Sequence, residues 1–439
     1  MKRLLFCSVA FIAVFALVMP ASAAEMKVNG IWNAKAWARD NFDGTDDVDD
    51  STQYVTQRMR MYFNFIASEN LKLVYKNEID MEWGDTTPTV ARNSGGGLGG
   101  DTINLETKNV YLEFMVPDTP VKATLGLQGV TLHKGWFISD DIGAARFDMN
   151  FDPISVTTYW AGANGLEADD NDSSNDNWQL VASGAYKAEN LDARLTFGYE
   201  RLPNSVAGNA PDGTSTIDTP DSNDLFLVMG ELNMSFDMFS FFVIAGSNFG
   251  ERDSDGADDR DYSGYMFDAG VSFALDMATI RGRFFMASGD DDEGQDDDFQ
   301  TMSGATMSWA EIVSDGYSYD RSASLSQIGA ANKPSNIWVA SVGADLKPTD
   351  TTTIKLDVYY IGMVEDRTVA GDDEDEIGIE IDARLTQKIY DTLSLTVIGA
   401  YLFAEDGYGT YNGTPTATNQ ADGSGDDAFQ VGVGLDFKF

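Results

Sequence analysis

Apolar and polar residues alternate along most of this chain with the two-residue period of a β-strand. In residues 71 to 83, one set of alternate positions is apolar and is interrupted only by Asn77: Leu71, Leu73, Tyr75, Ile79, Met81 and Trp83. The other set is charged and is interrupted only by Val74: Lys72, Lys76, Glu78, Asp80 and Glu82. Because successive side chains of a strand point to opposite faces, this segment has one apolar and one charged face, which helical spacing would mix.

The same alternation recurs along the chain and continues to its last residue. It appears in four further segments, at 55–65, 121–128, 279–286 and 377–385. In the final stretch, "AFQVGVGLDFKF", every odd position from Phe429 to Phe439 is apolar, and the even positions between them hold Gln, Gly, Asp or Lys. Alternating segments of this kind predict half-buried strands, so we expect an all-β protein.

The connections between these segments alternate between short and long. The short ones are residues 67–70, 117–120, 151–153, 187–190, 236–239, 275–277, 347–352 and 390–392. The long ones are rich in acidic residues: 40–52, 84–105, 164–176, 202–223, 250–262, 289–335, 366–376 and 405–427. This alternation predicts an up-and-down antiparallel meander with all of its tight turns at one end. It contains 18 strands if residues 144–151 form a strand of their own, and 16 is the alternative.

The length of the strands separates a membrane barrel from a soluble sandwich. Strands of soluble sheets are usually about 5–6 residues long, whereas about 9–11 residues are needed to cross a bilayer at a tilt. Many strands predicted here have nine or more residues. Backbone groups in lipid find no water to bond, so a sheet there must close on itself. We therefore predict a transmembrane β-barrel with its apolar side chains toward lipid and its polar side chains toward a wet lumen; a secreted sandwich or solenoid is the alternative.

The first 23 residues have the form of a cleaved signal peptide. Lys2 and Arg3 precede an apolar run over residues 4–18, and the small residues 21–23 form a signal-peptidase site. The alternative, a membrane anchor, requires about 20 apolar residues, and this run is shorter. We expect residues 24–439 to form a single exported barrel domain. Cleavage would remove Cys7, the chain's one cysteine, so we expect neither a disulfide nor covalently attached haem.

The charge of the chain restricts its partners and its chemistry. The formal net charge is −42, which disfavours nucleic acid as a partner. A single histidine, His133, makes a histidine-rich metal centre or a serine–histidine active site hard to assemble. We therefore expect no cofactor and no enzymatic activity, with an outer-membrane hydrolase as the enzymatic alternative.

The signal peptide, the amphipathic strands and the terminal ladder ending in Phe439 together resemble Gram-negative outer-membrane general (diffusion) porins. The resemblance implies an outer-membrane location, contact with lipopolysaccharide, passive diffusion of ions and small hydrophilic solutes, and a homotrimer. In that family the terminal aromatics, here Phe437 and Phe439, belong to the signal for barrel assembly. The glycine-rich stretch at 93–101 lies where trimeric porins latch onto a neighbouring subunit, although a flexible loop is the simpler interpretation.

The resemblance also implies where the pore is narrowest. Residues 133–143 follow the fifth predicted strand, which is the position of the porin loop that folds into the lumen; an ordinary external loop is the alternative. The resemblance implies six candidate constriction residues in and beside this loop: His133, Lys134, Asp140, Asp141, Arg146 and Asp148. The charged faces of the strands give eight candidate lumen-wall residues: Arg58, Arg60, Lys72, Lys76, Glu78, Asp80, Arg281 and Arg283. This loop is shorter than the porin loop, and it contains Trp136 and Phe137.

Acidic loops around the external mouth predict a modest cation preference, which the wall arginines oppose. The stretch at 252–262 resembles part of a calcium loop, with four candidate ligands: Asp253, Asp255, Asp258 and Asp259. The spacing lacks the terminal glutamate of a complete calcium loop, so solvated surface is the simpler reading. We expect residues 289–335 to form a long external loop.

Two other functions remain open for a barrel of this kind. One is a structural barrel that sheathes a partner such as a cytochrome, whose haem would then belong to the partner. The other is a substrate-specific channel, which calls for a track of aromatic or charged side chains along the lumen. Tyr62, Tyr111 and Tyr359 on lumen-side positions are too scattered to indicate one.

Overall fold

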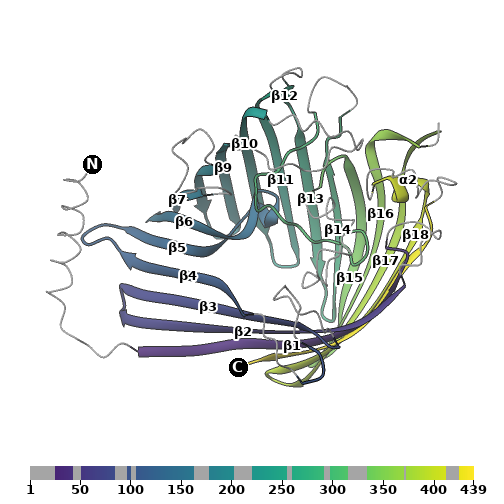
Figure 1. Cartoon of the computed structure of the whole chain (residues 1–439), viewed down its shortest axis with the longest axis horizontal. Coiled ribbons are helices and arrows are strands. Elements are labelled where there is room, and N and C mark those ends of the chain that lie inside the picture. The colour runs from purple at the N-terminus through teal and green to yellow at the C-terminus, as the bar shows by residue number, and fades with distance from the viewer. Residues whose placement is uncertain are drawn as a thin grey trace.

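The computed structural model describes residues 25–42, 51–84, 96–99, 105–162, 177–201, 220–254, 260–290, 297–314, 334–369, 372–411 and 425–439. These residues form a closed antiparallel barrel (Figure 1). Closure is direct, because β1 (Glu25–Asp40) pairs with β2 (Thr52–Ser68) on one side and with β19 (Ala428–Lys438) on the other. Two short segments, β12 (Arg260–Tyr262) and β13 (Tyr265–Ala274), both pair with β11 and form one interrupted strand. The barrel therefore has 18 strands, and the predicted fold class is confirmed.

The other strands follow one another around the wall. They are β3 (Leu71–Glu82), β4 (Leu105–Met115), β5 (Val121–Leu132), β6 (Ile138–Phe151), β7 (Ile154–Gly162), β8 (Trp178–Lys187), β9 (Leu191–Arg201), β10 (Pro220–Ser235), β11 (Phe239–Ser254), β14 (Ala278–Ala287), β15 (Ile337–Thr349), β16 (Thr352–Val369), β17 (Asp372–Tyr390) and β18 (Leu393–Ala404). The segment at 144–151 belongs to β6, which decides the count in favour of 18 over 16. The helices are η1 (His133–Gly135) and α2 (Asp406–Tyr411). No helix in the described ranges has the length and apolar character needed to span a membrane.

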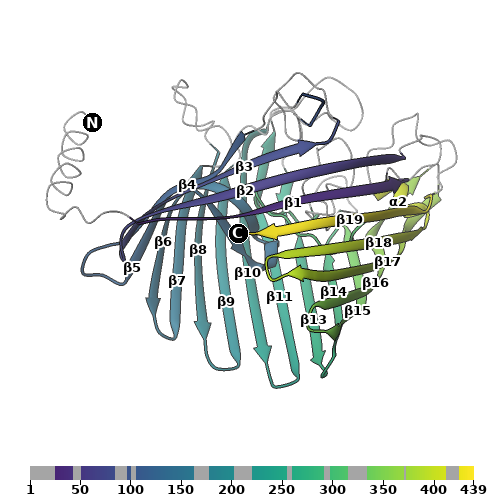
Figure 2. The same cartoon turned by 90° about the horizontal axis from the view of Figure 1, so that it is seen from below.

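Short turns join alternate pairs of strands along one rim of the barrel (Figure 2). At the other rim, several strand ends extend further than the sequence predicts. The predicted connection at 366–376 is mostly strand, because β16 continues to Val369 and β17 begins at Asp372. Likewise, β11 continues to Ser254, inside the predicted connection at 250–262. The acidic residues therefore do not end these strands, whose backbone register aligns residue 367 with residue 374.

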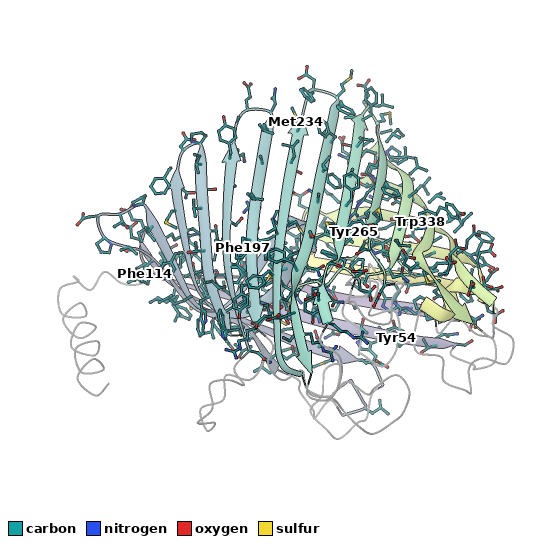
Figure 3. All side chains as sticks on the ribbon, turned by 90° about the horizontal axis from the view of Figure 1, so that it is seen from above. Tyr54, Phe114, Phe197, Met234, Tyr265 and Trp338 are labelled. Atoms are coloured by element: carbon teal, nitrogen blue, oxygen red, sulfur yellow. The ribbon has the colours of Figure 1, made fainter. Side chains whose placement is uncertain are left out.

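The outer face of the wall is apolar, as the alternation predicts. On β9, Leu195 and Phe197 are 62% and 44% exposed, whereas Thr196 between them is fully buried and faces inward. Figure 3 shows the same outward placement for Phe114, Met234 and Trp338 on other strands. A ring of exposed apolar side chains is the surface that a lipid bilayer stabilises.

The interior is only partly the wet lumen that the sequence predicts. On β7 to β16, many inward-facing side chains are apolar and buried: Tyr159, Val181, Leu227, Met229, Ile244, Met266, Phe285, Val339 and Ile361. They pack against chain segments that fold into the barrel. On β2 and β3 the inward-facing positions are charged, and they include Arg58, Glu78 and Asp80. The lumen thus has an apolar side and a charged side.

Candidate channel constriction

The β5–β6 hairpin leaves the barrel wall and enters the interior (Figure 1). Pairing between β4 and β5 stops at Val110 and Leu127, whereas pairing between β5 and β6 continues to Leu132 and Ile138. The side chain of Gln128 stabilises this divergence, because its Nε2 donates to the carbonyl oxygens of residues 124, 126 and 144 at 3.1–3.2 Å. The hairpin above this point therefore lies inside the barrel.

The tip of the hairpin contacts the wall at β9, β10 and β13. His133 Nε2 lies 2.7 Å from Thr196 Oγ1 of β9, and His133 Nδ1 lies 3.3 Å from Glu231 Oε2 of β10. Trp136 Nε1 donates to Asp268 Oδ2 of β13 at 2.8 Å, and Arg283 donates to both oxygens of the same carboxylate at 2.9 and 2.8 Å. These polar bonds fix the tip against strands far from it in sequence.

A second segment, residues 297–314, also runs through the interior, and we call it the inner loop. Its large apolar side chains are at most 8% exposed: Phe299, Met302, Met307, Trp309, Ile312 and Val313. Its first half is held by β8, β9 and β11. Asn248 Oδ1 accepts from the backbone N–H of Gln300 at 3.0 Å, and Glu200 Oε2 accepts from that of Ser303 at 2.8 Å.

The second half of the inner loop is held by two carboxylates of β17. Glu380 accepts hydrogen bonds from the backbone N–H groups of Ile312 and Val313, at 2.6 and 3.0 Å. Asp382 Oδ2 accepts from the backbone N–H of Glu311 at 3.1 Å, and the Glu311 side chain pairs with Arg384. Three successive N–H groups in a segment without regular structure are thus satisfied by wall side chains, which a buried backbone requires.

The two inward segments meet and form a continuous partition. The backbone N–H of Ser139 donates to Gly304 O at 2.9 Å. Gly198 is needed where both segments press on β9, because a Cβ there would lie 2.5 Å from Met302 Sδ and 2.6 Å from Phe137 Cζ. Edge-to-face aromatic contacts then cross the interior with ring-centroid distances of 5.2–6.1 Å: Phe299–Trp136, Trp136–Phe285, Phe285–Trp309 and Trp309–Tyr359.

The charged side of the lumen is a network of ion pairs on β2 and β3. Arg58 donates to both oxygens of Asp80 at 2.6 Å and lies 3.3 Å from Glu78, with all three side chains at most 1% exposed. Arg60 also pairs with Glu78, and the Lys76 ammonium lies 5.0 Å from the centre of the Tyr62 ring. These predicted wall residues are brought together, and they bond to one another.

The predicted constriction residues are divided between two places. His133 and Lys134 lie at the hairpin tip, where Lys134 Nζ is 3.7 Å from Glu231 Oε1. Asp140 and Asp141 lie on the inward part of β6. Arg146 and Asp148 lie in the wall, bonded to each other at 2.9–3.0 Å, and a neighbouring pair links Lys72 to Glu113 at 3.0 Å.

The remaining candidates are placed as follows. Arg281 pairs with Asp345 and Asp357 at 3.0 and 2.9 Å, near the short turns. Phe439 closes the barrel through two backbone hydrogen bonds to Gly30, and its ring stacks on that of Phe437 at 5.7 Å. The calcium candidates Asp255, Asp258 and Asp259, the side chain of Asp253 and the predicted signal peptide lie outside the described residues. Within the described ranges no group of three acidic, histidine or cysteine side chains is arranged to hold a metal ion.

The alternating pattern does not predict the inner loop or its anchors Glu200, Glu380 and Asp382. One signal was available in "TMSGATMSWAEIV", residues 301–313, which is rich in large apolar residues within a connection that is otherwise acidic. An apolar run in an exported loop indicates a buried segment.

Two cavities are lined by the half of each strand nearer the short turns. One has a volume of about 240 Å³ and lies beside the inner loop; it is lined by residues 308–311 together with Arg281, Lys355, Tyr359 and Arg384, and by the carboxylates Asp357 and Asp382. The other, of about 340 Å³, lies next to Lys134 and includes residues 281–283 of the wall. Both cavities carry cationic and aromatic side chains.

Comparison with known proteins identifies the architecture. No family model and no curated protein matches the sequence. Solved structures match over almost the whole length. OpdO from Pseudomonas aeruginosa has a TM-score of 0.58 and 11% identity over 94% of this chain and 97% of that one. The chain shares its fold. OccAB1 from Acinetobacter baumannii gives 0.56 and 11% over 95% and 99%. The outer membrane protein opdK from P. aeruginosa gives 0.55 and 8% over 94% and 99%.

Proposed function

We propose that this protein is an outer-membrane channel through which small hydrophilic solutes cross passively. An exposed apolar belt around a closed barrel supports a membrane location. The shared architecture with the outer membrane protein opdK supports the outer membrane in particular. Export by a signal peptide at residues 1–23 and assembly as a homotrimer remain parts of this proposal.

We further propose that the channel selects its solutes, in contrast to a general diffusion porin. The observation that carries this is the partition formed by the hairpin tip and the inner loop. It fills the middle of the β7–β16 side with buried apolar side chains. The other side of the lumen carries the buried charged network of Arg58, Glu78 and Asp80. A solute that passes on this side is influenced by those charges over about one Debye length, about 8 Å.

The alternative of a sheath around a cytochrome is less well supported. Segments of the chain itself occupy the interior in which such a partner would sit. We also propose a modest cation preference. The arginines that would oppose it are bonded to carboxylates, which reduces their effect on passing cations: Arg58, Arg60, Arg281 and Arg283.

The test compares the intact protein with a variant in which residues 300–312 are replaced by a short Gly-Ser linker. In planar bilayers the intact protein should give small, steady conductance steps, and the variant steps several-fold larger, because the partition is gone. Liposome swelling with solutes of graded size should show a higher size limit for the variant. Absence of channels in both proteins would overturn the proposed function, and equal conductance would overturn the role of the partition. Unboiled gel samples test the trimer.

A further inference from the structure

A third cavity, of about 220 Å³, lies between β6, the start of β8 and the bend of the inner loop at Ser303 and Gly304. The cavity lies near the strand ends that lead into the long connections. A solute that arrives from that side therefore meets the cavity before the partition. Its polar side chains come from Asp140, Asp141, Gln179 and Ser303. None of the contacts that form the partition depends on these carboxylates.

Gln179 presents a buried acceptor to this cavity. The side chain is 2% exposed, and its Nε2 donates to Glu200 Oε1 at 2.9 Å and to Ser303 O at 2.8 Å. Because both partners are acceptors, the amide orientation is fixed and Oε1 is turned away from them. Gln179 Oε1 has no hydrogen-bond partner among the described residues. A buried polar atom of this kind is uncommon and calls for a bound partner.

Asp140 adds a negative charge at the same place. Its Oδ1 accepts from the backbone N–H of Asp141 at 2.7 Å, and no cationic side chain of the described ranges pairs with it. Asp141 differs, because it lies 3.3 Å from Lys108 Nζ and accepts from Asn109 at 2.6 Å. Gly304, at φ +84°, allows the inner loop to approach, since a Cβ there would lie 3.1 Å from Asp140 Cβ. Within the described ranges, the Asp140 charge is therefore not neutralised by a cationic side chain.

The chemistry of the cavity determines what it can hold. Acceptors converge on it, while the Gln179 amide donor is already engaged, so a ligand must bring hydrogen-bond donors and positive charge. A divalent ion such as calcium requires about six to eight oxygen ligands, and the described residues offer no cluster of three acidic, histidine or cysteine side chains. A primary ammonium group carries three N–H donors on a compact charge. We propose that this cavity binds the primary ammonium group of a small amine, through Asp140 and Gln179 Oε1. The role of this site in the passage of a solute rests on the proposed channel function.

The experiment uses ethylammonium as the probe, with the full-length protein in detergent and in planar bilayers. Isothermal titration should show saturable binding of ethylammonium. Asp140→Asn should weaken it about tenfold or more, because a charge-assisted hydrogen bond is replaced by a neutral one. Asp276→Asn, in the exposed β13–β14 turn, removes the same charge at a distant place and should leave binding unchanged. Tetramethylammonium has no N–H donor. Its affinity for the wild type should be no higher than the affinity of ethylammonium for the Asp140→Asn variant.

The possible outcomes separate this inference from the channel proposal. Equal affinities for the wild type and Asp140→Asn, or for the two ammonium ions, would overturn the site whether or not the protein conducts. Binding in detergent without conductance in bilayers would support the site and overturn the channel. Gln179→Leu gives a second check, provided that its heat-modifiable gel mobility shows a folded barrel. It should also weaken ethylammonium binding, and unchanged binding would contradict the role of Oε1.

Discussion

Glu380 offers the sharpest test of how the inner loop is held. It is fully buried, and its two oxygens accept from two consecutive backbone N–H groups, those of Ile312 and Val313. In Glu380→Gln one of these oxygens becomes an NH₂ group, which faces an N–H donor. A hydrogen bond to a charged group contributes about 1.5–3 kcal/mol. Losing it should raise the population of the released loop by a factor of roughly 10 to 150.

Cysteine labelling measures this population directly. Ala310 is 2% exposed and small, so Ala310→Cys fits the docked loop with little disturbance. The predicted mature chain has no other cysteine. A methanethiosulfonate reagent should label Cys at position 310 about tenfold faster or more in the Glu380→Gln background, because reaction requires release of the loop. Glu376→Gln, the same change at an exposed position of β17, is the control. Equal labelling rates in the Glu380→Gln and wild-type backgrounds would refute the anchoring role of Glu380.

Three further substitutions probe the partition and the charged network. Gly198→Leu should displace Met302 and the inner loop and enlarge the single-channel conductance, since its Cβ alone would overlap the Met302 sulfur; unchanged conductance would contradict the close packing. Trp136→Phe should remove the hydrogen bond to Asp268 at a cost of about 1.5–3 kcal/mol. Single-channel recordings should then show more frequent closing and opening events, and a recording without them would contradict the role of this bond. Arg58→Met should remove the bidentate partner of the buried Asp80 and one of the partners of Glu78. This should destabilise the barrel by about 3–5 kcal/mol, lower the temperature at which it loses its folded gel mobility, and shift the reversal potential toward cations. A variant as heat-resistant as the wild type would contradict the burial of this network.

The wall of the barrel could be predicted from the sequence because its two faces meet different environments. Lipid on one side and a different environment on the other impose a two-residue period, so the strands, the turns and the closure at Phe439 follow from the pattern alone. Arg58, Glu78 and Asp80, which the same pattern assigned to the inward face, are buried in the structure.

The filling of the barrel could not be predicted in the same way. The contacts of Glu380 with Ile312 and of Trp136 with Asp268 join residues 68 and 132 positions apart, and no local period encodes them. A partial signal exists on β10, where residues 225–229, "LFLVM", are apolar without alternation. A strand covered on both faces reads this way. Such a run is typical of a wall segment that protein covers on its inner face.

The tethering of the inner loop by side chains has a consequence for the evolution of this barrel. Its anchors at Glu200, Asn248, Glu380 and Asp382 are side chains on ladder strands, so replacing one of them leaves the strand-to-strand backbone pairing as it is. A point mutation can thus change how the inner loop is held without altering the wall around it. The same wall can therefore accept different fillings, and this chain shares its fold with OpdO at 11% identity.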